Sequence, residues 1–435
     1  MRRHPSHIAT AHPVRQALGR LVLAAGLTVL VMMLIGAISL YVRHCQRTLG
    51  VGAVEGPVLN ATTAWGDDLA RAGRFTANIA FTDFAVPGDG ETEIALTWDD
   101  NWFFDESTAY NPELACAGSV IASLAYAESG YYQADSDCLP YMELGLSALG
   151  MTNISTDSYR YRSEVVDEVL GLVTQEADGA AFGIAEKRIV SNEGEERQLI
   201  VASIRGSYGS EWLSNLSVMG GEDHPGYTGA ADEVARALAP RIERAQEAGL
   251  AVELLLVGHS RGGAIANLVA ARADDALFGD GVNVRAYTYA SPATTLSADA
   301  ACARYANIFN IANPADIMTH LPLEEWGYAR YGVDVTLPGV TDADFAARYE
   351  KMQRTFEQVM GATSPYNPDD ELLIESLTSD IAGQVKTVEE LYTPAGVASV
   401  ASTVALRVSP WELLYAHYPS VYIAWLASFV GTPQS

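Results

Sequence analysis

A short apolar run, followed at once by a glycine-rich turn and a helical stretch, constrains the fold of this chain most. Residues 252–257 (VELLLV) have the character of a buried strand, and residues 264–273, rich in Ala, Leu and Val, predict a helix. Ser260 lies at the joint, with Gly258 and Gly262 two residues away on either side. A sharp strand-to-helix turn needs small residues there because backbone passes close to backbone. This is the spacing of a nucleophile elbow, and the alternative is a serine in an ordinary glycine-rich turn.

Other segments alternate between strand-like and helix-like patterns. Strands are predicted at residues 181–190, 197–203, 282–290 and 305–311, and helices at residues 111–126, 163–173 and 229–248. Such alternation is typical of a mainly parallel sheet covered by helices on both faces, so we expect an α/β fold. Two strand-like runs at residues 81–86 and 92–97, separated by the turn residues PGDG, predict a hairpin ahead of it.

Residues 21–42 (LVLAAGLTVLVMMLIGAISLYV) carry no charged side chain. As a helix they would extend about 33 Å, enough to cross the hydrocarbon core of a bilayer. A secretory signal peptide would end in a pair of small residues after a shorter apolar core, whereas this run ends in Tyr41-Val42-Arg43-His44. We therefore favour an uncleaved transmembrane helix over a cleaved signal peptide.

Positive charge lies mainly before this segment. Residues 1–20 carry four arginines and no acid, against Arg43 and Arg47 just after the apolar run. This bias predicts a single-pass protein with its N-terminus in the cytoplasm and its body outside. The expected organisation is a basic cytoplasmic tail (1–20), a transmembrane anchor (21–42), a spacer with short strands (43–105) and an α/β domain (106–435).

The amino-acid composition limits the kinds of molecule that this chain is expected to bind. The chain has 54 acidic against 27 basic residues, a formal net charge of −27, which disfavours nucleic acid as a partner. The spacings of Cys45, Cys116, Cys138 and Cys302 match no metal motif. A disulfide between Cys116 and Cys138 would close the shortest loop, and Cys45 and Cys302 could equally be free thiols.

A serine hydroxyl is a good nucleophile only if a base takes its proton, and a third group must orient that base. Setting aside the histidines that precede or adjoin residues 21–42, the candidates are His224, His259, His320 and His417. His259 is disfavoured because neighbouring side chains at a tight elbow point apart, and His224 is expected to order a loop. In hydrolases with the order serine, acid, histidine the base comes last, which favours His417 over His320.

Four motifs in order give the chain a resemblance to the class 3 lipases, α/β-hydrolases related to the fungal triacylglycerol lipases, over residues 111–428. They are Ile204-Arg205-Gly206-Ser207, similar to an R-G-[ST] oxyanion motif; His224-Pro225-Gly226-Tyr227, similar to H-x-G-[FY]; the G-H-S-x-G elbow at 258–262; and Asn313-Pro314-Ala315-Asp316, similar to an N-x-x-D segment that carries an acid.

This resemblance implies that Ser260 is the nucleophile, Asp316 the acid and His417 the base. It also implies an oxyanion hole formed by Ser207 and the backbone N–H of Arg261. Residues 208–221 would form a lid with an apolar underside, although a buried helix would show the same pattern. No metal and no organic cofactor are implied. The interval from Asp316 to His417 is longer than in the compact fungal enzymes, and its helical-looking segments 342–361 and 369–385 are expected to form an extra cap.

The function expected from these features is that of a membrane-anchored serine ester hydrolase. It would be a lipase or phospholipase that cleaves acylglycerols or related lipids outside the cytoplasm through an acyl-enzyme. The alternatives are a short-chain esterase or other acyl hydrolase, and a catalytically silent, membrane-tethered binding protein that kept the fold.

Overall fold

The computed structural model describes residues 72–83, 85–86, 90–132, 138–161, 180–206, 221–391, 393, 395–396, 399–400, 403 and 414–430. The predicted transmembrane segment 21–42, the predicted helix 163–173, Ser207 and almost all of the predicted lid lie outside these residues. Among the helices of the described ranges, none is both long and apolar enough to cross a membrane.

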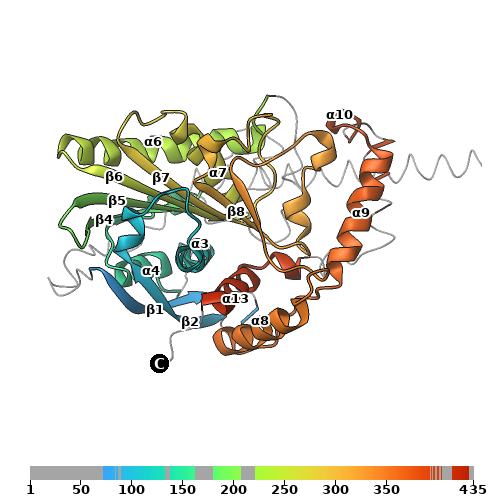
Figure 1. The fold of residues 1–435 in the computed structure, drawn as a ribbon, viewed down its shortest axis with the longest axis horizontal. Coiled ribbons are helices and arrows are strands. Elements are labelled where there is room, and N and C mark those ends of the chain that lie inside the picture. The colour runs from blue at the N-terminus through green and yellow to red at the C-terminus, as the bar shows by residue number, and fades with distance from the viewer. Residues whose placement is uncertain are drawn as a thin grey trace, which may run out of the picture. The chain divides into compact units, whose positions relative to one another are not determined.

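A seven-stranded sheet forms the centre of the fold, with its strands in the order in which they occur along the chain (Figure 1). Its strands are β3 (Thr152–Ser155), β4 (Phe182–Val190), β5 (Glu196–Ile204), β6 (Ala251–His259), β7 (Val282–Tyr289), β8 (Ile308–Ala312) and β9 (Val333–Thr336). β3, β4 and β5 pair antiparallel, and β5 to β9 pair parallel. The predicted mainly parallel sheet is confirmed, while β3 and β9, the two edge strands, were not predicted.

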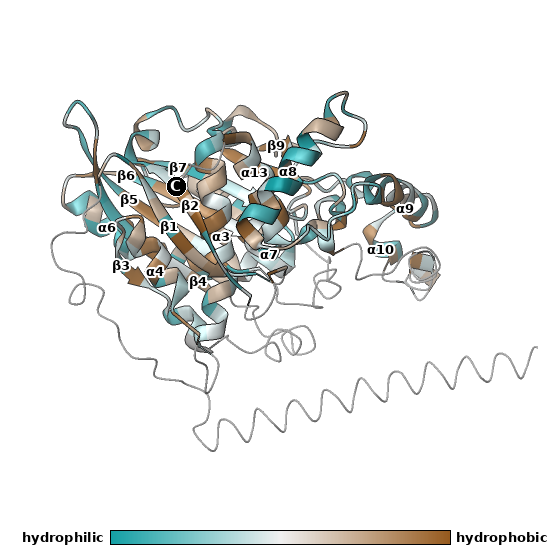
Figure 2. Ribbon diagram, turned by 90° about the horizontal axis from the view of Figure 1, so that it is seen from below, coloured by the Kyte–Doolittle hydropathy of each residue, from teal (hydrophilic) through white to brown (hydrophobic). Residues whose placement is uncertain are grey.

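Helices cover both faces of this sheet, as predicted. In β6, Leu255 and Val257 pack into one apolar core and Leu254 and Leu256 into another. Both faces of the strand are therefore buried, which explains why its sequence is continuously apolar rather than alternating. In Figure 2 the central strands are coloured mainly as hydrophobic, whereas helices such as α6 and α8 include many residues coloured as hydrophilic.

The helices α6 (Pro225–Glu247) and α7 (Arg261–Asp274) cover one face of the sheet, and α3 (Pro112–Tyr131) and α13 (Pro419–Val430) cover the other (Figure 1). The remaining helices are α4 (Tyr141–Ala148), α8 (Phe345–Met360), α9 (Asp370–Gln384) and α10 (Val388–Leu391). Short 3-10 helices are η2 (Asp100–Phe104), η3 (Asp157–Tyr161), η5 (Ala303–Tyr305), η6 (Ile317–His320), η7 (Glu324–Trp326) and η8 (Tyr415–His417). α13 was not predicted, because its residues are buried on every side and show no helical period.

The predicted hairpin is confirmed, but its first strand lies earlier in the chain than the predicted residues 81–86 and both strands are longer than expected. β1 (Arg74–Thr82) and β2 (Glu91–Asp99) pair antiparallel. Ile79, Phe81 and Trp98 point into the same core that α3 and α13 share. The hairpin therefore packs as part of the α/β body rather than standing apart from it.

The two segments predicted to form a cap, residues 342–361 and 369–385, contain the helices α8 and α9, which lie against different parts of the fold. α8 packs against α13 and β2, so it belongs to the layer on the α3 face and does not form the expected cap. α9 instead lies against the segment that follows β8. Its buried Ile374, Leu377 and Ile381 form an apolar cluster with residues of that segment such as Met318.

The Cys116–Cys138 disulfide suggested by the sequence is wrong. Cys116 lies near the start of α3, whereas the sulfur of Cys138 packs against Gly130, near the end of the same helix. Almost four helical turns, about 20 Å, separate those two positions, far beyond disulfide reach. Loop length alone could not reveal the rigid helix between them.

Two glycines allow β5, β6 and α7 to meet at the turn around Ser260. A Cβ atom added to Gly262 would collide with the carbonyl oxygen of Ile204, and one added to Gly258 would collide with the backbone of Gly262. Neither position has room for a side chain, which explains the glycines on either side of Ser260 in the sequence.

We expect Gly262→Ala to destabilise the protein by about 1–3 kcal/mol, because the end of β5 must move away to admit a methyl group. Gly383→Ala is the matched control. Among the described residues, no atom outside the adjacent backbone of α9 lies within 4 Å of the position that its Cβ would occupy, so this substitution should raise stability by roughly 0.5 kcal/mol. Thermal melts of the two variants check the prediction, and equal melting temperatures would contradict it.

Candidate active site

Ser260 occupies a strained turn between β6 and α7. It precedes the first residue of the helix and has φ 57° and ψ −129°, a backbone conformation that residues other than glycine rarely adopt. Its N–H donates to the carbonyl oxygen of Tyr289 at 2.8 Å, which anchors the turn to the end of β7. The predicted sharp turn from strand to helix is confirmed.

Three side chains from separate parts of the chain form one hydrogen-bonded line. The Nε2 atom of His417 lies 2.9 Å from the Oγ of Ser260, and its Nδ1 lies 2.8 Å from Oδ2 of Asp316. Ser260 follows β6, Asp316 follows β8, and His417 ends η8 just before α13. The structure thus brings together the three residues that the sequence named.

Asp316 is fully buried and held by further donors. The N–H of Met318 donates to its Oδ1 at 3.0 Å, and the hydroxyl of Tyr422 donates to its Oδ2 at 2.7 Å. Burial, with the Asp316 carboxylate beside it, raises the pKa of Tyr422 well above its usual value, so its hydroxyl stays protonated. Sequence reasoning missed Tyr422, since an apolar helix gives no local signal for a hydrogen bond to a distant loop.

The loop before α13 is tied to the segment after β8 by Asn313. Its Nδ2 donates to the carbonyl oxygen of Ala416 at 3.1 Å, and its backbone N–H donates to the hydroxyl of Tyr422 at 3.1 Å. Asn313 is the first residue of the N-x-x-D motif. Its amide therefore connects the loop that carries Asp316 with the loop that carries His417.

A carboxylate from the N-terminal hairpin caps the helix that follows His417. Oδ2 of Asp83 accepts the N–H of Ser420 in the first turn of α13 at 3.2 Å, and Oδ1 accepts the N–H of Ala85 at 2.9 Å. Burial raises the pKa of this carboxyl group. The first turn of α13 is thus fixed by a residue more than three hundred positions earlier in the chain.

The other candidate histidines make different contacts. His224 caps α6 by accepting the N–H of Gly226 at 3.2 Å and stacks on Tyr227, and burial lowers its pKa to about 4. The Nε2 of His320 lies 3.1 Å from the carbonyl oxygen of Pro314. His259 is buried and directs its Nδ1 to the hydroxyl of Tyr126, 3.0 Å away. Its ring does not share a hydrogen bond with Ser260, in agreement with the sequence argument against it.

Of the two residues predicted to form an oxyanion hole, the structure describes Arg261 but not Ser207. Arg261 is the first residue of α7, where backbone N–H groups have no partner within the helix and the helix dipole favours negative charge. Gly206, which precedes Ser207, lies against Ser260 and the backbone of His259. Ser207 itself lies outside the described residues.

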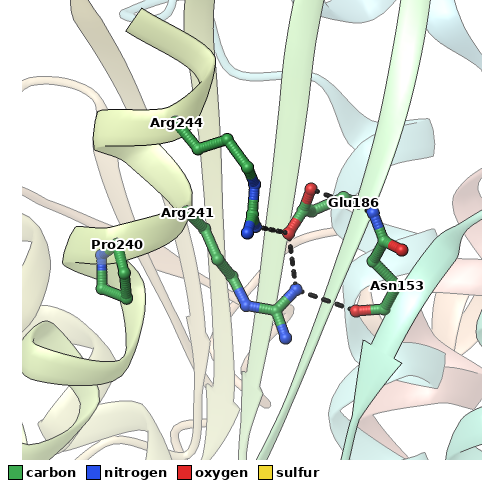
Figure 3. A pocket seen from close by; sticks show the side chains of 5 residues that line it. All are labelled: Asn153, Glu186, Pro240, Arg241 and Arg244. Atoms are coloured by element: carbon green, nitrogen blue, oxygen red, sulfur yellow. Dashed lines mark hydrogen bonds and ion pairs between the residues drawn. The ribbon is translucent and has the colours of Figure 1, made fainter. Parts of the chain in front are cut away.

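A surface pocket of about 520 Å³ is lined by side chains from β3, β4 and α6 rather than by the line of Ser260, His417 and Asp316 (Figure 3). Glu186 accepts hydrogen bonds from Arg241 at 2.6 Å and Arg244 at 2.9 Å, and Arg241 also donates to the carbonyl oxygen of Asn153. These contacts attach α6 to the sheet edge. Within the described ranges, no three His, Cys, Asp or Glu side chains gather as they would around a metal ion.

Comparison with solved structures finds fungal lipases. The Rhizomucor miehei lipase–propeptide complex is 20% identical, with 53% of this chain and 70% of that chain covered and a TM-score of 0.37. A triacylglycerol lipase described as having a serine protease triad is 19% identical (54% and 82% covered, TM-score 0.36). A mutant form of MDLA from Penicillium cyclopium is 20% identical (55% and 86% covered, TM-score 0.33).

Because these TM-scores are below 0.5, the family assignment rests on the sequence match. Residues 201–326 match the family described as lipase (class 3). The matched segment contains Ser260 and Asp316, whereas His417 lies beyond it. This match supports the resemblance to the class 3 lipases over the segment that carries Ser260 and Asp316.

Proposed function

We propose that this protein is a serine ester hydrolase that cleaves acylglycerols or related lipids through an acyl-enzyme, with Ser260 as the nucleophile. The observation that supports it most is the position of His417, whose two ring nitrogens contact Ser260 at 2.9 Å and Asp316 at 2.8 Å. A serine, a histidine and an acid in this arrangement can activate the hydroxyl without a cofactor.

In the proposed reaction the Oγ of Ser260 attacks the ester carbonyl carbon while its proton passes to Nε2 of His417. The carbonyl oxygen becomes an oxyanion, and the tetrahedral intermediate collapses when His417 returns the proton to the leaving alcohol. Ser260 then carries the acyl group. His417 next takes a proton from water, the resulting hydroxide attacks the acyl-enzyme, and the carboxylic acid leaves as Ser260 recovers its proton.

Asp316 would act by holding the imidazole in one tautomer. Its carboxylate would accept a hydrogen bond from the Nδ1–H group, which leaves Nε2 free to accept the proton of Ser260. Tyr422 and the N–H of Met318 keep the carboxylate itself in place. The backbone N–H of Arg261 and the residue Ser207 are proposed to donate to the oxyanion, and one such donor typically lowers the barrier by about 3 kcal/mol.

We also propose that residues 21–42 anchor the protein in a membrane with the hydrolase body on the outer side. The support comes from the uncharged apolar sequence and from the arginines that precede it. Residues 208–221 are proposed as a lid over the site, on the strength of the family resemblance.

Ser260→Ala should abolish ester hydrolysis, by at least about a thousandfold, together with labelling by a fluorophosphonate probe, because no acyl-enzyme can form. Ser291→Ala is the matched control, since Ser291 is also buried and its hydroxyl donates to the neighbouring carbonyl oxygen of Pro292, away from His417. It should retain labelling. Turnover of Ser260→Ala within tenfold of wild type would refute the assignment.

His417→Ala should lose about four or more orders of magnitude in turnover on a soluble short-chain ester, because the Ser260 hydroxyl would lack its proton acceptor. His320→Ala should remain active. His224→Ala should lower the melting temperature through loss of the α6 cap, worth about 1 kcal/mol, and change turnover only modestly. An inactive His320→Ala beside an active His417→Ala would reverse the assignment of the base.

The proposed topology can be tested by adding protease to intact cells or spheroplasts. We expect digestion of the body while an epitope tag at the N-terminus stays protected. Permeabilised cells, in which both ends should be digested, provide the control. Full protection of the body in intact cells would mean the opposite orientation.

A further inference from the structure

A second histidine lies against the ring of His417. The ring of His259 has its centroid 4.8 Å from that of His417, with an angle of 54° between the two planes. His259 ends β6 and immediately precedes Ser260, whereas His417 comes from the loop before α13. The imidazole that bonds Ser260 is therefore supported by a side chain from the same turn.

The His259 ring is held in turn by Tyr126 of α3. The hydroxyl of Tyr126 lies 3.0 Å from Nδ1 of His259, and the two rings meet edge to face. Both side chains are buried, with 2% of His259 and 8% of Tyr126 exposed. In the part of the chain that the structure describes, Nε2 of His259 has no hydrogen-bond partner. Tyr126 is thus the side chain that hydrogen-bonds this ring.

His259 stays neutral in this environment. Burial, and then the neighbouring His417, lower the pKa of His259 well below its usual value. Among the described residues, the titratable groups in contact with it are Tyr126 from α3, His417 from the loop and Tyr422 from α13, and none of them is a carboxylate that would favour a charged imidazole. A neutral ring can contact His417 without repelling the positive charge that His417 gains when it takes a proton.

The Tyr126 hydroxyl also lies against Gly206, just beyond the end of β5. A Cβ atom on Gly206 would collide with this hydroxyl, and the carbonyl oxygen of His259 lies 3.4 Å from it. One hydroxyl from α3 therefore lies where the end of β5 meets the turn after β6.

We propose that Tyr126 and His259 are positioning residues that act as one unit, in which the Tyr126 hydroxyl orients a neutral His259 ring and that ring fixes the plane of His417. The inference rests on the proposed function, because it assigns these residues to the same reaction. Neither residue touches the ester. They keep Nε2 of His417 aligned with the Oγ of Ser260, so their loss should lower kcat rather than weaken substrate binding.

A double-mutant cycle on the full-length protein, assayed on a soluble short-chain ester, tests the inference. Tyr126→Phe removes only the hydroxyl, and His259→Phe keeps a ring but removes the hydrogen bond. Each should lower kcat about tenfold and leave KM within about twofold of wild type. If the two act as one unit, the double variant should also lose only about tenfold, whereas independent effects would multiply to about a hundredfold.

Tyr132→Phe is the matched control. Tyr132 follows α3 and bonds the hydroxyl of Thr156 at 2.7 Å, so this variant also loses a buried hydroxyl contact, away from His417. Its melting temperature should fall while its kcat stays within about twofold of wild type. Three results would each overturn the inference. They are a kcat of Tyr126→Phe within about twofold of wild type, an effect of either substitution on KM alone, and a double variant in which the two losses of kcat multiply.

Fluorophosphonate labelling of the wild-type protein separates this outcome from failure of the proposed function. Labelled wild type with an unaffected Tyr126→Phe variant refutes the positioning role alone. Wild type that neither hydrolyses the ester nor takes up the probe refutes the proposed function, and the positioning role with it.

Discussion

The close contact between Gly262 and the carbonyl oxygen of Ile204 is the constraint on which the rest of the site depends. It brings the end of β5, the turn after β6 and the first turn of α7 together through main-chain atoms alone. Ser260 and the N–H of Arg261 are therefore placed by backbone packing, with no flexible side chain between them. The positive φ of Ser260 is tolerated because β6, which leads into the turn, is paired on both sides, with β5 and with β7.

His417 depends on longer-range contacts, since no strand leads to it. Asn313 ties its loop to the segment after β8, and Tyr422 reaches back from α13 to Asp316. The buried face of α13 packs against α3, and Asp83 caps its first turn. The proposed base is thus located by side-chain hydrogen bonds and helix packing, and this explains why polar groups accumulate around it in an otherwise apolar core.

Much of this arrangement could be predicted from the sequence where the signal is local. The run before Gly258, the glycines themselves and the N-x-x-D segment specify positions within a few residues of each other, so Ser260 and Asp316 could be named. His417 followed from chain order and family resemblance. Tyr126, His259 and Tyr422 could not be assigned, because their contacts join segments more than a hundred residues apart. The Cys116–Cys138 pairing failed for a different reason, since the rigid helix α3 separates two residues that are near in sequence.

The cap that Asp83 provides means that this fold cannot be divided where its sequence suggests. The family match begins at residue 201, and the sequence placed the start of the α/β domain at residue 106. A fragment cut at either point would expose the apolar residues that face β1 and β2 and leave the first turn of α13 without its acceptor. A fragment that keeps this core intact must therefore include β1 and β2 as well as α13, which lie on either side of the matched residues 201–326.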